Sequence, residues 1–75
     1  MKWYVISHPS RGWYTGSEYE ITKDGYKWVP HFAWSVTARD DRVERLYSQR
    51  EIDRELNKMP KKVREKCTVQ ELKSR

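Results

Sequence analysis

The sequence contains little cysteine, glycine or proline, and it has no long apolar segment. Its 75 residues include one cysteine, three glycines and three prolines. One cysteine cannot form an internal disulfide, and small secreted domains usually carry several, so we expect a cytoplasmic protein. No stretch comes near the roughly 20 apolar residues that a membrane-spanning helix needs, which predicts no membrane partner. The first residues also lack the apolar core of a secretory signal.

The chain is short and polar, yet it is rich in aromatic side chains. Hydrophobic and charged residues each make up 36% of it, and ten residues are Trp, Tyr or Phe. A chain of this length buries only about 60% of its unfolded surface, so its core must be small. Disordered chains are poor in aromatic residues, which favours a folded chain. We therefore expect one domain over residues 1–75, with no room for a dinucleotide-binding fold.

The beginning of the chain has the composition of a β-hairpin. Aromatic and β-branched residues dominate residues 2–7, and an aromatic pair opens the segment 13–15. Between them, Pro9 cannot donate to a strand ladder and Gly12 tolerates positive φ, which is typical of a turn. Gly16 predicts a bulge or a kink after the second strand.

A second hairpin is predicted around Asp24-Gly25. This dipeptide fits a type I′ turn, and residues 18–22 and 26–29 flank it as strands. In the first of these strands polar and apolar residues alternate, as in a strand with two different faces. Pro30 is expected to interrupt the returning strand, because proline has no N–H to donate.

Helical signals appear in the second half of the chain. Ser48 and Glu51 have capping-box spacing, and the apolar residues Ile52, Leu56 and Met59 then recur at intervals of four and three. This pattern predicts a helix over 48–59.

Pro60 marks the end of that helix and a suitable first turn for another. The same capping-box spacing recurs at Thr68 and Glu71, with Leu72 behind it. We therefore predict a second short helix within residues 60–73.

Together these signals predict a small α+β fold, with residues 1–37 mainly β and residues 48–73 mainly α. We expect a three- to four-stranded antiparallel sheet packed by one or two C-terminal helices. The opposite register of the sheet, with the other set of side chains inward, stays open. The predicted core consists of Val5, Trp13, Ile21, Trp28, Val36, Leu46, Ile52 and Leu56.

No pattern of catalytic or metal-binding residues is evident. His8, His31 and Cys67 lie far apart, whereas structural zinc ligands usually come in close pairs, so we expect no metal and no cofactor. Cys67 follows Val63 by four residues and is interpreted as a small packing residue. No oriented base or oxyanion site accompanies it, so we expect no enzymatic activity.

The aromatic residues are the most informative feature for function, because nine of the ten lie within residues 1–34. Neighbouring strand residues point to opposite faces, so some of these rings stay exposed unless a partner covers them. An exposed aromatic patch typically marks a binding surface. Stacking of nucleic-acid bases, stacking of sugars and a core that simply uses large side chains are the alternatives. The predicted protein contacts are Tyr4, Tyr14, Tyr26, Arg11 and Lys27.

Positive charge gathers near the C-terminus. The formal net charge is +5, and residues 41–75 contribute +4 of it, from eleven basic and seven acidic residues. A basic cluster can neutralise phosphates, which makes a small DNA- or RNA-binding regulator the alternative function. A solvated helix face is the plainer interpretation of the same residues. The basic residues concerned are Lys58, Lys61, Lys62, Arg64 and Lys66.

Over residues 2–59 the chain resembles small accessory proteins of bacteriophages and other mobile elements. The resemblance lies in Tyr4–Ile6, Gly12–Thr15, a Trp-containing stretch, and Arg45–Glu51 leading into Ile52 and Leu56. It implies a viral protein of the host cell cytoplasm that binds a host protein or protein–nucleic-acid complex, as an anti-defence inhibitor does. It assigns no role to any single residue. An open sheet edge would also allow a homodimer.

Overall fold

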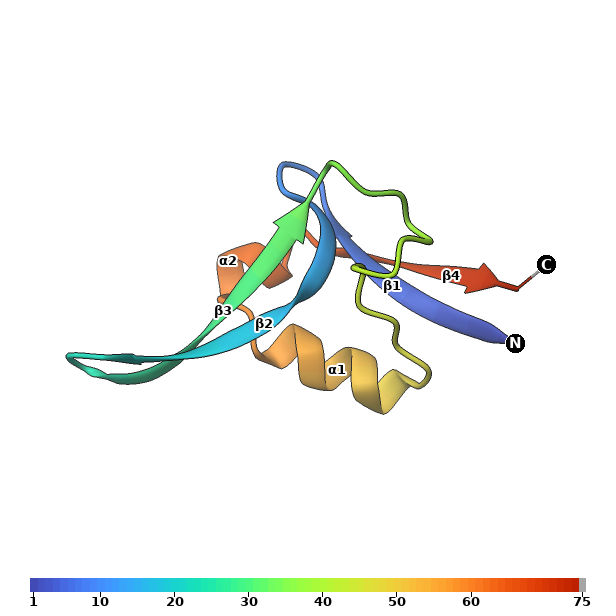
Figure 1. Cartoon of the computed structure of the whole chain (residues 1–75). Coiled ribbons are helices and arrows are strands. Elements are labelled where there is room, and N and C mark those ends of the chain that lie inside the picture. Colours follow the sequence, from blue (N-terminus) through green and yellow to red (C-terminus); the bar gives the residue numbers. More distant parts are fainter. Residues whose placement is uncertain (75) are drawn as a thin grey trace.

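The structure is a computed structural model and describes residues 1–74. It has an α+β fold, as the sequence predicts, with one antiparallel four-stranded sheet in the order β3-β2-β1-β4 (Figure 1). The elements, in chain order, are β1 (Lys2–His8), β2 (Gly12–Thr22), β3 (Gly25–Ala33), α1 (Gln49–Asn57), α2 (Lys61–Arg64) and β4 (Thr68–Lys73).

Strand β4 was not predicted. It pairs with β1 along its whole length, from Ser7↔Thr68 to Lys2↔Lys73, so the prediction of a capped helix at residues 68–71 is wrong. The capping-box spacing is a local signal, and it is outweighed by the hydrogen bonds that β1 offers along its open edge. The pairing continues past the strand, because the Ser74 N–H donates to the Met1 carbonyl at 2.8 Å.

The pairing of β1 with β2 is short. It covers Ser7↔Trp13 and His8↔Gly12 next to the turn, after which β2 diverges. Where β2 has diverged, residues 43–47 take its place beside β1, since Tyr4 and Leu46 exchange backbone hydrogen bonds of 2.6 and 2.9 Å. Tyr4 is therefore paired on both edges of β1, with Leu46 on one side and Glu71 of β4 on the other. The register of β2 shifts at Gly16, which confirms the predicted bulge.

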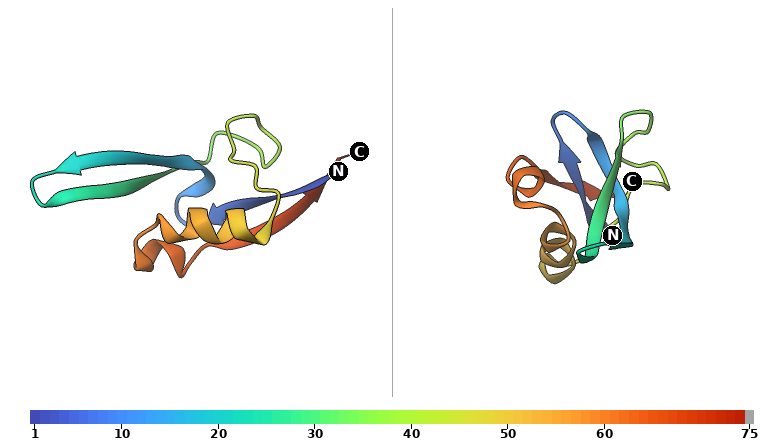
Figure 2. Two further views of the ribbon diagram at one scale, coloured as in Figure 1. Left: turned by 90° about the horizontal axis from the view of Figure 1, so that it is seen from below. Right: turned by 90° about the vertical axis from the view of Figure 1, so that its left-hand side faces the viewer.

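The core lies on both faces of β1, because the two helices cover one face and the loop between β3 and α1 covers the other (Figure 2). The helix side buries Ile6, Tyr14, Leu46, Ile52, Met59 and Val63. The loop side buries Trp3, Val5, Val36, Val43 and Leu72.

Of the predicted core, four residues are buried, two are partly buried and two are exposed. Buried are Val5, Val36, Leu46 and Ile52, and Trp13 and Leu56 are partly buried against the two clusters. Ile21 is 79% exposed and Trp28 is 38% exposed, so their placement in the core is wrong. Both lie outside the two core clusters.

The two helices begin as predicted. The Ser48 hydroxyl accepts the Glu51 N–H at 3.2 Å and caps α1. The Glu51 carboxylate does not return to the Ser48 N–H as expected; it accepts the Tyr47 N–H at 2.6 Å. Helix α2 follows Pro60 directly, which confirms a second short helix at this point.

Beyond the bulge, β2 and β3 leave the rest of the molecule as a two-stranded arm. We call residues 17–30 the arm and the remaining described residues the body. Figure 2 shows the arm projecting well past the helices, in a molecule of 47 × 27 × 21 Å. Pro30 pairs with Ser17 inside β3 rather than ending it, because β3 is an edge strand and loses no ladder bond there. A type I′ turn needs positive φ at both central residues. Gly25 has positive φ but Asp24 does not, so the predicted type I′ turn is wrong.

Candidate protein-binding site

One face of the arm carries four large side chains in two directly opposed pairs. Tyr19 pairs with Trp28 and Ile21 with Tyr26 across β2 and β3. Alternate residues of a strand share a face, so all four side chains lie on the same side of the arm. They are 54%, 79%, 66% and 38% exposed in the order Tyr19, Ile21, Tyr26 and Trp28. We call these four residues the aromatic face.

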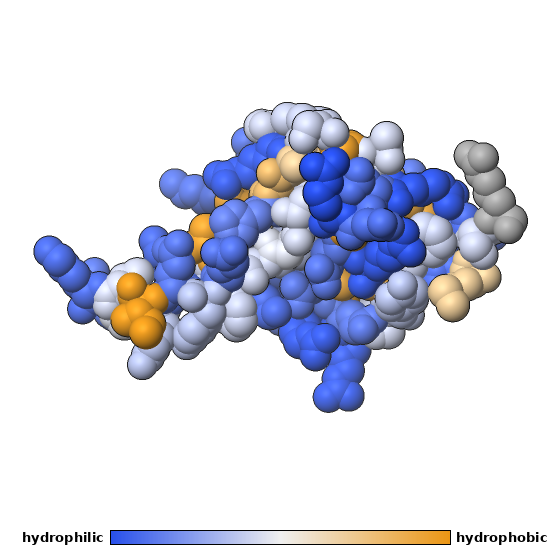
Figure 3. Space-filling model, in the orientation of Figure 1, coloured by the Kyte–Doolittle hydropathy of each residue, from blue (hydrophilic) through white to orange (hydrophobic). Residues whose placement is uncertain are grey.

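The rings of the aromatic face are ordered by contact with one another. The Tyr19 and Tyr26 rings stack at a centroid distance of 5.3 Å and an interplanar angle of 14°. The Trp28 ring meets Tyr19 edge to face at 4.7 Å, and the Lys58 ammonium lies 4.5 Å from the Trp28 centroid. Such aromatic pairs contribute about 0.5–1.5 kcal/mol beyond the area that they bury. The arm therefore holds an exposed surface in one arrangement without a core of its own, and Figure 3 shows hydrophobic surface near its end.

The charge of the arm differs from that of the body. The arm contains the acidic residues Glu18, Glu20 and Asp24 and the basic residues Lys23 and Lys27, a net charge of −1. The rest of the chain therefore carries +6, since the whole has +5. A polyanion is attracted to the body and not to the arm.

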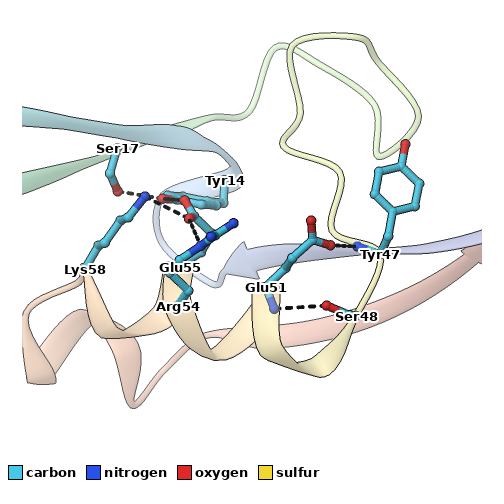
Figure 4. Close-up of polar contacts among 8 residues, drawn as sticks. All are labelled: Tyr14, Ser17, Tyr47, Ser48, Glu51, Arg54, Glu55 and Lys58. Carbon is cyan, nitrogen blue, oxygen red and sulfur yellow. Dashed lines mark hydrogen bonds and ion pairs between the residues drawn. The ribbon is translucent and has the colours of Figure 1, made fainter.

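The root of the arm is fixed to α1 by a buried polar network (Figure 4). The Tyr14 hydroxyl donates to Glu55 Oε1 at 2.9 Å and lies 2.5 Å from the Ser17 hydroxyl, which donates to it. Lys58 donates to Glu55 Oε2 at 2.9 Å. Burial, together with the Glu55 carboxylate, raises the pKa of Tyr14 well above its usual range, so the hydroxyl stays a donor. This network sets the position of the arm relative to the helix.

A polar hollow of about 590 Å³ lies beside this network, lined in part by His31, Glu44 and Arg54. Burial, followed by the nearby Glu55 charge, raises the pKa of Glu44. Glu55 is already bonded to Tyr14 and Lys58, and Arg54 lies 3.9 Å from it. These contacts hold Glu55 in place and support a structural role for the lining of the hollow at the root of the arm.

The five predicted protein contacts do not form one surface. Tyr26 lies on the aromatic face, Lys27 on the opposite face of the arm, and Arg11 in the exposed turn before β2. Tyr4 is partly buried, and its hydroxyl lies 3.4 Å from Glu71. Tyr14 is completely buried, so its prediction as a contact residue is wrong. It fails because the sheet is covered on both faces at that point.

Sequence reasoning placed the other members of the aromatic face elsewhere. Ile21 and Trp28 were predicted in the core, and Tyr19 was assigned no role. The signal that finds them is the alternation on both sides of the Asp24-Gly25 turn. Folding the two strands on that turn places Tyr19 opposite Trp28, and Ile21 opposite Tyr26.

The five basic residues at 58–66 are separated by their local partners. Lys58 is bonded to Glu55, Lys61 lies 3.9 Å from Glu65, and Arg64 donates to Asn57 at 3.3 Å. Lys62 and Lys66 instead line a depression that also contains Arg11.

Cys67 packs as the sequence predicts. It is partly buried against the helix-side cluster, and its thiol donates to the Val63 carbonyl at 3.3 Å. Burial raises the pKa of the thiol, and the charge of Arg11 offsets this only in part. A thiol with a raised pKa is a poor nucleophile at neutral pH, because the thiolate is the reactive form.

Three further results bear on the class of protein. Within residues 1–74, no group of three or more His, Cys, Asp or Glu side chains gathers as a metal site would. None of the helices in that range is both long enough and apolar enough to cross a membrane. Comparisons of the chain with protein-family models, curated proteins and solved structures give no match.

Proposed function

We propose that this chain is a non-catalytic, phage-type accessory protein that binds a host protein complex stoichiometrically through the aromatic face of its arm. The resemblance to phage accessory proteins suggests inhibition or redirection of that complex, as in evasion of a defence system. The observation that carries the proposal is the arm itself. Four large side chains are exposed on one face and ordered by mutual contact, and they belong to neither core cluster of the body.

Burial of this face by a partner is favourable for two physical reasons. Removing apolar surface from water contributes about 25 cal/mol per Å², and Tyr and Trp dominate the energetics of protein interfaces. The stacked rings of Tyr19 and Tyr26 are already in place before binding. A preordered surface loses less conformational entropy on association, which raises affinity.

A protein is favoured over a nucleic acid as the occupant of the aromatic face. Proteins that stack bases on aromatic side chains also line the groove with cations to hold the backbone. The arm instead has a net charge of −1, and Lys58, the cation nearest to Trp28, is bonded to Glu55. The matching partner is a protein with an apolar groove and a neutral to basic rim.

The proposal can be tested by capture followed by binding to purified material. The full chain, tagged at its N-terminus, captures its partner from bacterial lysate treated with nuclease, and mass spectrometry identifies the retained complex. The identified complex is then purified, and its affinity is measured for the wild type, the double variant Ile21→Ser/Tyr26→Ser, and Tyr47→Ser. Tyr47 is a matched control, because it is a tyrosine of similar exposure, 52%, outside the arm.

The expected result is a 1:1 complex whose affinity falls at least about 30-fold in the double variant, because loss of interface hot spots costs about 2 kcal/mol or more. Tyr47→Ser should stay within about twofold of the wild type. Activity of the purified complex should change fully at one equivalent of the protein. Equal binding by the double variant would rule out the aromatic face. A dimer of the free protein that dissociates in the double variant would show that a second copy occupies this face, and would overturn the proposal.

A further inference from the structure

A basic depression of about 390 Å³ lies between the β1–β2 turn and α2. It brings Arg11 from the turn together with Lys62 and Lys66, which flank the end of the chain's second helix. His8, Ser10 and Val63 also line it. These residues come from opposite ends of the sequence, so the site exists only in the folded chain.

The three cations of the depression are not neutralised by the protein. Arg11, Lys62 and Lys66 form no ion pair within 4.0 Å with any carboxylate in residues 1–74. Glu65 is the one acidic residue that lines the depression, and its carboxylate lies 3.9 Å from Lys61. A cluster of like charges without counter-charges is costly to hold together, and an anion relieves that repulsion.

His8 adds a neutral hydrogen-bond donor to this cluster. Its side chain is only 6% exposed, and its Nδ1 accepts the Ser10 N–H at 3.1 Å. The proton of the neutral ring is therefore on Nε2, which has no hydrogen-bond partner among the described residues. Burial first, and then the charges of Arg11 and Lys66, lower the pKa of His8, so the ring is neutral at pH 7.

We propose that this depression binds a phosphate group, and that the backbone of a nucleic acid supplies it. Three cations and an N–H donor match the oxygens of a phosphate. Val63 is the single apolar side chain lining the depression, so nothing there encloses a base or a sugar. A site of this composition binds a phosphate whatever the base sequence. Contacts of this kind set the position of a protein on a nucleic acid. The proposal does not depend on the aromatic face, and it suits a partner that contains both protein and nucleic acid.

The first experiment measures binding of the full chain to a short fluorescein-labelled single-stranded DNA between about 50 and 200 mM salt. Each phosphate contact contributes a slope of about −0.7 in log affinity against log salt, so three cations predict a slope near −2. The variant Arg11→Gln/Lys66→Gln should bind at least about tenfold more weakly and lose about 1.4 of that slope. Lys23→Gln/Lys27→Gln removes the same charge from the arm and should stay within about twofold.

The second experiment locates the phosphate by NMR of the His8 ring. Inorganic phosphate, titrated against chloride at equal ionic strength, should shift the ring signals and raise the pKa of His8. The groups around that ring are Arg11, Lys62, Lys66, the Glu65 carboxylate and the Phe32 ring, whose centroid is 5.8 Å away. These groups are the same at every point of the titration, and only the anion beside the ring changes.

The possible outcomes separate the sources of phosphate and the two proposals. Binding of inorganic phosphate without binding of DNA would overturn the nucleic-acid assignment, and DNA binding that is unchanged in Arg11→Gln/Lys66→Gln would overturn the site. Ile21→Ser/Tyr26→Ser should bind DNA normally, and Arg11→Gln/Lys66→Gln should still bind a protein partner through the arm. Failure of one proposal is therefore distinguishable from failure of the other.

Discussion

The body and the arm share the strand β2, yet the same kind of side chain has opposite surroundings in them. Tyr14 is completely buried, with its hydroxyl bonded to Glu55, whereas Tyr19 is 54% exposed and stacks only on other arm residues. Both are tyrosines in a strand of alternating pattern. What differs is the cover, because α1 lies over β2 at Tyr14 and nothing lies over it at Tyr19. Burial is decided here by topology and not by the hydrophobicity of the residue.

The body and the arm also contribute differently to the stability of the protein. The body buries both faces of β1 and supplies the free energy of folding. The arm leaves much of its apolar surface in water and contributes less to stability, and the proposed binding function accounts for its large residues. Substitutions in the two regions should then have separable effects, and four comparisons test this.

The largest contrast is expected between Tyr14→Ala and Tyr26→Ala. Removing a buried aromatic side chain costs about 3–5 kcal/mol, and here it also removes the hydroxyl that donates to Glu55 Oε1. Removing the ring of Tyr26, which is 66% exposed and stacks on Tyr19, should cost only about 0.5–1.5 kcal/mol of the free energy of unfolding. Urea unfolding followed by circular dichroism measures both. Equal losses would mean that the arm is part of the core.

Gly12→Ala and Gly25→Ala compare two glycines of positive φ. At either position an alanine is strained by about 1–2 kcal/mol, because their φ values are 101° and 124°. A Cβ at Gly12 would also lie 2.4 Å from the Ala33 carbonyl oxygen, whereas nothing lies within 4 Å at Gly25. Crowding of this kind adds about 1–3 kcal/mol, so Gly12→Ala should lower the unfolding midpoint clearly more. Similar midpoints would show that β3 can move away from the turn.

A finer comparison removes one oxygen from each region. Tyr14→Phe keeps the ring and deletes the hydroxyl that donates to Glu55, which should cost about 1–3 kcal/mol because a buried carboxylate loses a partner. Tyr19→Phe deletes an exposed hydroxyl and should be neutral within about 0.5 kcal/mol. Thermal unfolding of both variants beside the wild type gives the difference. A neutral Tyr14→Phe would mean that Lys58 and Arg54 suffice for Glu55.

The smallest effect expected is a dependence of body stability on pH through His8. Its pKa in the folded state lies below the unfolded value of 6.5 because of burial and the charges of Arg11 and Lys66. Below 6.5 the unfolded chain binds a proton that the folded chain does not, so stability falls as pH decreases from about 6.5 to the folded pKa. Above 6.5 this contribution is complete and constant.

Chemical denaturation across this pH range checks the sign. In His8→Gln the decrease should be shallower, and in Arg11→Gln the NMR-measured pKa of His8 should rise toward 6.5 because one repelling charge is gone. A decrease of the same steepness in His8→Gln would assign the effect to other groups.

Local patterns were sufficient to predict most of the elements. The aromatic and β-branched composition of residues 2–7, the hairpin at Asp24-Gly25 and the cap at Ser48 are all local signals, and the structure shows each of these elements. The segment Thr68–Lys73 was misread because its capping-box spacing is equally local. Its true partner is β1, at the other end of the chain, and no local pattern records that pairing.

The candidate site was predictable in kind but not in position. Tyr26 was correctly placed on an exposed surface, while Trp28 was assigned to the core because large apolar residues are usually buried. Where β2 leaves the body depends on the bulge at Gly16 and on α1 stopping short of the arm. The proximity of Arg11 and Lys66 also could not be predicted from the sequence, because it depends on the packing of the β1–β2 turn against α2.

The pairing of β1 with β4 has a practical consequence for handling the protein. It brings Met1 and Ser74 into hydrogen-bonding contact, and Figure 2 shows the N-terminus and the end of β4 at the opposite end of the molecule from the arm. A reporter or affinity handle joined to either end is therefore held away from both candidate surfaces. A short linker between the ends would close the chain into a ring without crossing the arm. New ends opened at the Asp24-Gly25 turn of this ring would give a circularly permuted chain in which the body is not cut.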